Sequence, residues 1–473
     1  MKTEVFWDRM KSILGQDYPA FADAVTDCEA VRAFRVHLPA EKIGDFLSVF
    51  PYPVERHPVF SDAFYCTAEK LGNTPFHHAG LIYLQDPSAM AVVHALDIQK
   101  GWHVLDLCAA PGGKTTQLSA AVGKTGAVVA CEYVEKRCAI LNENLERLGC
   151  SNTVVLHTAA DAVAGAFPGK FDLVLCDAPC SGEGMFRKNS RAQDEWSPEN
   201  VTMCAERQKR ILESAVACVR PGGYLLYSTC TFAPEENEEN AAYVLSRFPE
   251  MELCAPSAEV TALSSPGLKL QTTDMDPSLC RRFYPHVHRG EGQFLALFRK
   301  AASAICGEAA GNGKGDLKTV PEKDMQTVRA FLEQTLDGDA AGDCLLKIFK
   351  NRIYLVRPQL EQYLTAPGLV TPGVPLGDLE KGRLEPHHWF AKAFGHEFRN
   401  RIDLTGREDI VRQYLTGNEI PVEEGVSGFC ALTYAGGVLG CVKASSGRGK
   451  NRYPKGLRLA PGTATGPEET KRS

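Results

Sequence analysis

Short apolar runs alternate with longer amphipathic stretches between residues 100 and 300. The apolar runs predict buried strands at 103–108, 127–132, 153–157, 171–177 and 224–229. The amphipathic stretches predict helices near 114–121, 134–148, 199–219 and 235–247. Such alternation is typical of an α/β fold with a mostly parallel, doubly wound sheet, covered by helices on both faces. Because ligands gather at the carboxyl ends of the strands in such sheets, we expect a site there.

The flanking segments predict additional small domains. In the mixed N-terminal segment, FRVHL (34–38) predicts a strand and AEKIGDFLSVF (40–50) predicts a helix, which indicates a small α+β domain. The stretch at 301–318 is rich in Ala and Gly and has no aromatic residue, which is typical of a linker. The predicted division is an N-terminal segment at 1–90, the α/β domain at 91–300, the linker at 301–318, a small domain at 319–382, a compact β-rich domain at 383–460 and a frayed tail at 461–473.

Length and composition restrict the class of protein. A chain of 473 residues exceeds what one hydrophobic core usually holds, so several domains are expected. The formal charge of −6 argues against nucleic-acid binding over the whole surface but leaves room for local basic patches. The 17 cysteines are scattered without a CxxC pair, which favours a reducing cytoplasm and argues against a metal site. With no signal-like N-terminus and no long apolar run, we expect a cytoplasmic protein without a membrane segment.

The segment DLCAAPGGKT (106–115) follows the first predicted strand and opens the next helix. Its small residues let the backbone approach a ligand, and the free N–H groups of a helix start can bind a carboxylate. A phosphate-binding P-loop would need Gly at position 108, which is Cys. Glu132 at the second strand end could accept ribose hydroxyl groups, and Asp161 after the third could meet an adenine amino group. Together these residues fit S-adenosylmethionine without requiring it.

Two cysteines follow the fourth and fifth predicted strands, in DAPCSGEGMFR (177–187) and STCTFAPEEN (228–237). Neighbouring strand ends would bring Cys180 and Cys230 to one crevice beside the cofactor loop. A thiolate that adds to C6 of cytosine makes C5 nucleophilic, so that C5 can take a methyl group from a sulfonium. Asp177 could hydrogen-bond cytosine N3 and its amino group, and Lys114 could hold the base or the cofactor by a charge-assisted hydrogen bond.

The blocks DLCAAPGGKT, DAPCSGEGMFR and STCTFAPEENE resemble those of the NOL1/NOP2/Sun family of RNA 5-methylcytosine methyltransferases, and the resemblance covers roughly residues 1–300. LQDPSAM (84–90) and PHVHRGEGQF (285–294) are also similar to family blocks. The resemblance implies a Rossmann-like class I methyltransferase domain, S-adenosylmethionine as cofactor, and a preceding RNA-binding segment. The residues that it implies for contact with the cofactor or the target base are Cys108, Ala109, Ala110, Pro111, Gly112, Gly113, Lys114, Glu132, Asp161 and Asp177.

By the same resemblance, Cys230 corresponds to the nucleophile and Cys180 to the cysteine that helps to release the product. DNA cytosine methyltransferases use the cysteine of their Pro-Cys block as the nucleophile, so spacing alone does not decide between the two. One departure is Arg35-Val36-His37, where relatives more often have Arg-Val-Asn. This leaves the N-terminal RNA contact open.

The C-terminal segments LEPHHWFAKAFG (384–395) and VKASSGRGKNRYPKGLRL (442–459) are similar to the PUA-like end of the bacterial family members that modify small-subunit ribosomal RNA. The second segment has cations and no acid over 443–458, with a tyrosine among them. Such a patch could neutralise phosphates and stack a base, although a solvated basic face is the alternative. The candidate RNA-binding residues are Lys443, Arg448, Lys450, Arg452, Tyr453, Lys455 and Arg458.

The resemblance therefore implies an enzyme that methylates C5 of cytosine in small-subunit (16S) ribosomal RNA or in the 30S particle. We expect it to be a monomer. A transfer-RNA 5-methylcytosine enzyme is an alternative, because the catalytic core does not report its RNA. A ribosome-assembly factor that binds RNA without catalysis is a second alternative. Because Cys180 and Cys230 are both present, the enzyme is favoured over this factor.

Overall fold

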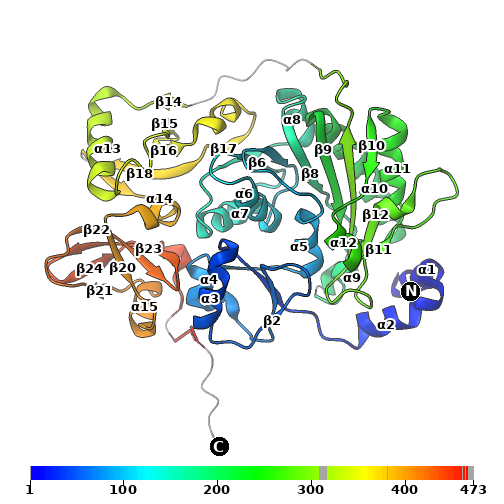
Figure 1. Cartoon of the computed structure of the whole chain (residues 1–473), viewed down its shortest axis with the longest axis horizontal. Coiled ribbons are helices and arrows are strands. Elements are labelled where there is room, and N and C mark those ends of the chain that lie inside the picture. Colours follow the sequence, from blue (N-terminus) through cyan, green and yellow to red (C-terminus); the bar gives the residue numbers. More distant parts are fainter. Residues whose placement is uncertain are drawn as a thin grey trace, which may run out of the picture.

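The computed structural model describes residues 2–188, 190–307, 317–380, 382–460, 462–463 and 465–466. Over these residues the strands form a four-stranded, a ten-stranded and two five-stranded sheets. Figure 1 shows the ten-stranded sheet beside the N-terminal sheet in blue, with the C-terminal part in yellow to red on the left. None of the helices in the described ranges combines the length and the apolar composition that a bilayer crossing requires.

The ten-stranded sheet contains the five predicted strands. In chain order they are β5 (His103–Asp106), β6 (Ala127–Glu132), β7 (Thr153–His157), β8 (Phe171–Asp177) and β9 (Val219–Thr229). They run parallel in the spatial order β9-β8-β5-β6-β7, which confirms the predicted α/β class. β9 begins at Val219 rather than at the predicted position 224, and β5 ends at Asp106 rather than at 108.

Helices cover both faces of this sheet. The helices of this region are α5 (Pro87–Val93), α6 (Gly113–Val122), α7 (Glu135–Arg147), α8 (Ala160–Ala166), α9 (Ser190–Glu195), α10 (Pro198–Cys218), α11 (Glu238–Arg247) and α12 (Ala258–Leu263), of which α9 packs beside the N-terminal helices. Leu105 and Val129 point to the face that α8 and α10 cover, whereas their neighbours Val104 and Val128 pack with α5 and α6. This alternation of two buried faces explains why the strands are apolar throughout.

Antiparallel strands extend the sheet at both edges. They are β10 (Met251–Cys254), β11 (Ser265–Pro266), β12 (Cys280–Phe283) and β13 (Gln293–Lys300) beyond β9, and β17 (Leu369–Thr371) beyond β7. β13 pairs directly with β9, with Phe294 opposite Thr229. This pairing brings the start of β13 to the end of β9 at which the predicted site lies.

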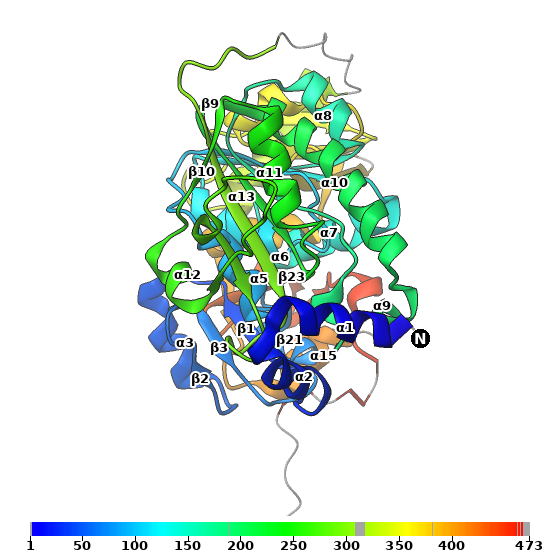
Figure 2. The same ribbon diagram turned by 90° about the vertical axis from the view of Figure 1, so that its right-hand side faces the viewer.

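The N-terminal region holds the predicted strand and helix. Its sheet contains β1 (Ala33–Val36), β2 (Glu55–Arg56), β3 (Ala63–Tyr65) and β4 (Ile82–Leu84), and its helices are α1 (Lys2–Leu14), α2 (Tyr18–Thr26), α3 (Ile43–Val49) and α4 (Pro75–His78). Figure 2 shows α1 and α2 close to α9. Phe6 of α1 packs there against Phe186 and Trp196, which anchors the N-terminus beside the large sheet.

Two small sheets follow in the C-terminal third. The first contains β14 (Lys318–Thr319), β15 (Leu345–Phe349), β16 (Arg352–Val356), β18 (Val374–Glu380) and β19 (Arg383–Pro386), next to α13 (Glu322–Thr335). The second contains β20 (Asn400–Asp403), β21 (Ile420–Pro421), β22 (Gly428–Tyr434), β23 (Gly437–Ser445) and β24 (Arg448–Asn451), with α14 (His388–Phe394) and α15 (Glu408–Leu415).

The structure shifts one predicted domain boundary. β19 pairs with β18, so the first small sheet extends to Pro386 rather than ending at the predicted position 382. β17, which lies within the predicted small domain, pairs instead with β7 of the large sheet. Half of the predicted linker, at 308–316, and most of the predicted tail, at 461, 464 and 467–473, lie outside the described residues.

Candidate active site

The predicted cofactor loop joins β5 to α6. Gly112 has a φ of 108°, in the left-handed region that favours glycine. A Cβ at Gly112 would lie 3.1 Å from Leu141 Cδ1, and one at Gly113 would lie 3.2 Å from Tyr83 Cε1. The backbone conformation therefore favours glycine at 112, and at both positions a Cβ would require the neighbouring side chain to shift by a few tenths of an ångström.

A cavity of about 190 Å³ lies against this loop. Its lining includes Tyr83, Gln85, Asp106, Cys108, Ala109, Ala110, Pro111, Gly113, Lys114 and Asp177. Burial raises the pKa of Asp106 to about 7, although the Thr115 hydroxyl donates to its Oδ2 at 2.7 Å and opposes that shift. The predicted loop residues thus line one cavity, apart from Gly112, which shapes the turn behind it.

The two predicted nucleoside-binding acids lie at neighbouring strand ends, outside the lining of this cavity. Glu132 ends β6 and is 3% exposed, and it accepts the N–H of Val134 at 2.9 Å and pairs with Arg137 Nη1 at 3.2 Å. Asp161 is exposed in the first turn of α8, where it accepts the N–H of Ala162 at 2.8 Å. Both carboxylates thus lie at or after the ends of neighbouring strands of the sheet, β6 and β7.

Asp177 ends β8 and collects donors from three other elements. Lys114 Nζ of α6 lies 2.7 Å from its Oδ2, and Ser228 Oγ of β9 donates to its Oδ1 at 2.6 Å. Gln293 Nε2 of β13 donates to the same Oδ1 at 3.3 Å. Burial alone would lower the pKa of Lys114, but the Asp177 carboxylate raises it above its usual value, so the ammonium form is retained.

Sequence reasoning did not single out Ser228 and Gln293. Ser228 lies in STCTFAPEENE and Gln293 lies in PHVHRGEGQF, two of the blocks that resemble the family. The blocks therefore indicated the region of the site, but nothing in them indicated the individual roles of these two residues. The antiparallel pairing of β13 with β9, which brings Gln293 to the site, joins segments far apart in the sequence.

The structure brings the two predicted cysteines together. β8 and β9 pair with Asp177 opposite Ser228, and the loops that follow put Cys180 Sγ 3.2 Å from Cys230 Sγ. The hydrogen bond with Cys230, together with burial, raises the pKa of Cys180 well above its usual value. The thiol form of Cys180 is therefore favoured over its thiolate, within hydrogen-bonding distance of the Cys230 sulfur.

The predicted basic patch begins on the hairpin of β23 and β24 and continues into the segment that follows β24. Lys443 pairs in register with Lys450, and Arg448, Lys450 and Lys455 are exposed. Other cations of the patch have partners within the protein. Lys443 lies 5.2 Å from the Phe429 ring centroid, Arg452 pairs with Glu385 at 2.7 Å, and Arg458 donates to the Tyr453 carbonyl at 3.3 Å.

The prediction that Tyr453 stacks a base is wrong for this structure. Tyr453 is 4% exposed, and its ring packs against His388 and Tyr414. Its hydroxyl lies 2.8 Å from His78 Nδ1. Tyr453 lies between cations in the sequence, but it is a core residue whose hydroxyl group has a hydrogen-bond partner within the protein.

A parallel sheet in this order, with the glycine-containing loop after its first strand, defines a class I methyltransferase, the enzyme class that uses S-adenosylmethionine as methyl donor. Residues 93–299 match the family described as 16S rRNA methyltransferase RsmB/F, 3–87 match the N-terminal domain of 16S rRNA methyltransferase RsmF, and 399–459 match the methyltransferase RsmF PUA domain. The chain belongs to the family of the ribosomal RNA small subunit methyltransferase F, which confirms the predicted resemblance.

Curated relatives with this description match almost the whole chain. The one from Vibrio vulnificus is 31% identical over 468 residues, covering 96% of this chain and 97% of the relative. The one from Klebsiella pneumoniae is 30% identical, covering 96% of each chain. The protein is thus an rRNA methyltransferase.

Solved structures resemble a little under two thirds of the chain. A methyltransferase homolog protein from Pyrococcus horikoshii is 31% identical with a TM-score of 0.55, covering 63% of this chain and 94% of that one. NSun6 from Pyrococcus horikoshii, solved with SFG, is 21% identical with a TM-score of 0.53, covering 63% of this chain and 98% of that one. The likeness to NSun6 supports the fold.

Proposed function

We propose that this rRNA methyltransferase acts on C5 of cytosine through a covalent bond between Cys230 Sγ and C6 of the base. The observation that carries the proposal is the pair of thiols 3.2 Å apart, at strand ends that also hold the Lys114–Asp177 ion pair beside the cofactor loop. An enzyme that methylates a more nucleophilic ring atom would need neither thiol.

The cofactor cavity suits S-adenosylmethionine in its chemistry. Asp106 Oδ1 and Gln85 Oε1 are buried at this cavity without a hydrogen-bond partner, so acceptors are available for an ammonium group. Glycine at 113 adds no Cβ beside Tyr83 and Gln85, which line the same cavity. Loop residues 108–114 would hold the methionine part, and Glu132 and Asp161 would hold the ribose and the adenine. When bound, S-adenosylmethionine supplies an electrophilic methyl group on a sulfonium.

The protein groups divide the work on the cytosine ring. Cys230 loses its thiol proton to a base as its Sγ bonds to C6, the π electrons of the C5–C6 bond move toward C5, and the negative charge spreads to N3 and O2. Because Lys114 already pairs with it, Asp177 serves as an acceptor for the exocyclic amino group. Lys114 Nζ then remains as the donor to N3 or O2, where charge develops. This arrangement makes C5 the nucleophile.

Release of the product requires the S–C6 bond to break, with its electrons returning to the sulfur. The proton on C5 leaves to a base, its electron pair rebuilds the C5–C6 double bond, and the Cys230 sulfur departs with the electrons of the S–C6 bond. We assign to Cys180 the protonation of that sulfur, because its S–H lies at 3.2 Å and is held as a thiol. Cys180, left as a thiolate, then takes up a proton from the base that removed the C5 proton, so that both thiols return to their starting form.

The RNA assignment rests on the C-terminal hairpin and on the relatives. Arg448, Lys450 and Lys455 offer exposed cations for backbone phosphates, with Lys443, Arg452 and Arg458 adjacent. The relatives are described as small-subunit rRNA methyltransferases, which favours 16S rRNA or the 30S particle over transfer RNA. A target cytosine must leave its stack to reach the crevice, which costs a few kcal/mol and is easiest in a loop.

A methyl-transfer assay with nucleoside analysis tests the proposal. Purified protein, unmethylated 30S particles or 16S rRNA, and methyl-labelled S-adenosylmethionine should yield label in 5-methylcytidine. Unmodified transfer RNA in a parallel reaction should remain unlabelled. Label in another nucleoside would contradict the cytosine assignment, and label in transfer RNA alone would favour the transfer-RNA enzyme.

A further inference from the structure

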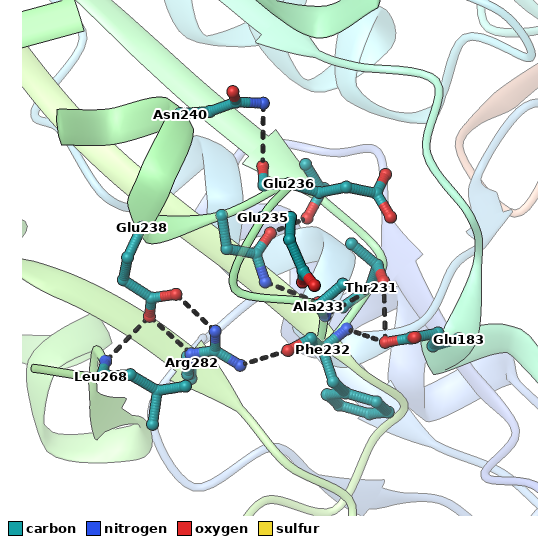
Figure 3. A network of polar contacts seen from close by, with 12 residues as sticks. Glu183, Thr231, Phe232, Ala233, Glu235, Glu236, Glu238, Asn240, Leu268 and Arg282 are labelled. Atoms are coloured by element: carbon teal, nitrogen blue, oxygen red, sulfur yellow. Dashed lines mark hydrogen bonds and ion pairs between the residues drawn. The ribbon is translucent and has the colours of Figure 1, made fainter. Parts of the chain in front are cut away.

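The loop that carries Cys230 is held from both sides over three consecutive residues. The N–H of Gly184 donates to the Cys230 carbonyl at 2.9 Å, and the hydroxyl of Thr231 donates to Glu183 Oε2 at 2.9 Å. The N–H of Phe232 donates to the same Oε2 at 2.9 Å. Figure 3 shows Glu183 reaching Thr231 and Phe232. The turn after Cys180 therefore fixes the backbone that follows Cys230.

A buried ion pair holds the opposite side of this loop. Arg282 Nη1 donates to the Phe232 carbonyl at 2.9 Å, and Arg282 Nε donates to Glu238 Oε1 at 2.6 Å (Figure 3). The side chains of Arg282 and Glu238 are 1% and 0% exposed. Both polar atoms of the Phe232 backbone are thus bound by charged side chains from other segments.

Each of the two cysteine blocks also contributes a glutamate carboxylate that binds the other block. Glu183 belongs to the block of Cys180 and binds the backbone of the Cys230 block. Glu236 belongs to the block of Cys230 and accepts the N–H of Ser181, next to Cys180, at 3.0 Å. Ser181 Oγ lies 2.8 Å from Thr231 Oγ1, and because Thr231 donates to Glu183 it accepts here from Ser181. These contacts join the two cysteine loops into one unit.

Glu183 needs both of its carboxylate oxygens for this arrangement. Its Oε1 accepts the indole N–H of Trp196 at 2.8 Å, and its Oε2 accepts the two donors of the Cys230 loop. The residue is 3% exposed. Burying a carboxylate costs free energy that an apolar side chain of similar size would avoid. A carboxylate at this position is therefore explained by the donors that it holds.

We propose that Glu183 is a positioning residue for Cys230, holding its loop so that Sγ meets C6 of the target base. The inference rests on the proposed function, because it assumes that Cys230 is the nucleophile. A nucleophile must lie within about 3–3.5 Å of the reacting atom, and a misplacement of about 1 Å can lower the rate about 10²-fold. Loosening the loop should therefore affect bond formation more than cofactor binding.

The substitution Glu183→Gln tests the proposal with almost no change of volume. An amide has one acceptor oxygen, so its NH₂ group must face either the indole N–H of Trp196 or the two donors of the Cys230 loop. We expect the maximal rate of methyl transfer, and the rate of covalent adduct formation with RNA that contains 5-fluorocytidine, to fall about 10²-fold. The dissociation constant for S-adenosylhomocysteine should change less than about twofold, since Glu183 does not line the cofactor cavity.

The matched control is Glu235→Gln, which changes a glutamate of the same loop whose side chain is 33% exposed and paired with Arg9. It should keep the wild-type rate. Wild-type protein and Cys230→Ala are assayed beside both variants. If Cys230→Ala still methylates RNA, the proposed function fails. If it is inactive while Glu183→Gln stays within about threefold of the wild type, only the positioning role is overturned.

If the Glu183→Gln variant does not fold or does not bind the cofactor, a second pair of variants tests the same proposal. Thr231→Val removes the hydroxyl that donates to Glu183, whereas Thr231→Ser retains it. The valine variant should lower adduct formation at least about tenfold, and the serine variant should restore most of it. Equal rates for the two variants would contradict the proposal.

Discussion

The proposed catalytic crevice and the C-terminal hairpin differ in how firmly they hold the side chains to which we assign functions. In the crevice, Asp177 binds donors from α6, β9 and β13, and Cys180 lies 3.2 Å from Cys230. On the hairpin, Arg448 and Lys450 project from β24 and are exposed. The crevice is thus preorganised for chemistry at fixed atoms, whereas the hairpin offers charge that any phosphate backbone can meet.

This difference separates specificity of reaction from affinity for RNA. Substitutions in the crevice should change the rate of methyl transfer with little change in RNA affinity. Substitutions on the hairpin should change affinity, and its dependence on salt, with little change in the rate at saturating RNA.

The largest effect is expected from the two thiols. Cys230→Ala should lower methyl transfer by at least about 10³-fold and abolish the covalent RNA adduct, because the nucleophile is lost. Cys180→Ala should accumulate that adduct, because the departing sulfur is no longer protonated. Denaturing gel electrophoresis with labelled RNA measures both, with Cys254→Ala on β10 as the control. Swapped phenotypes would reverse the two roles and leave the family unchanged.

An intermediate effect is expected from the hairpin. Replacing Arg448 and Lys450 by Glu should weaken binding to 16S rRNA about tenfold or more and reduce the slope of affinity against salt by about one per cation removed. Titrations at several salt concentrations measure this, with Lys318→Glu on β14 as the control of equal charge change per site. An unchanged slope would show that RNA does not contact this hairpin.

The smallest effect is expected from Tyr453. Tyr453→Phe removes the hydroxyl that bonds His78 and should lower the free energy of unfolding by about 1 kcal/mol, with RNA affinity changed less than about twofold. Thermal or denaturant unfolding beside an RNA titration measures both quantities. Unchanged stability with a loss of RNA affinity would indicate that Tyr453 contacts RNA. It would also contradict the assignment of this residue to the core.

Much of the fold and the site could be predicted from local patterns. The five parallel strands are recognisable as apolar runs because both of their faces are buried. The loop before Lys114 is recognisable from its glycines. Chain order along a parallel sheet was sufficient to expect Cys180 and Cys230 at one crevice. These features depend on residues that are close in sequence or on a regular topology.

The remainder depends on contacts between distant segments. The pairing of β17 with β7, the donor Gln293 on Asp177, and the contact of Glu183 with the Cys230 loop each join parts of the chain that no local pattern connects. Tyr453 was misjudged for the same reason, since its ring is covered by His388 and Tyr414. Charge is visible in a sequence, but burial by distant elements is not.

The most direct measurement locates the covalent bond itself. RNA with 5-fluorocytidine at the modified position should trap the protein, because the fluorine at C5 cannot leave as a proton does. After digestion of the complex formed with S-adenosylmethionine, mass spectrometry should find the methylated nucleotide on the peptide that contains Cys230. A nucleotide on the peptide of Cys180, or no covalent complex from a protein that methylates the unsubstituted RNA, would contradict the account.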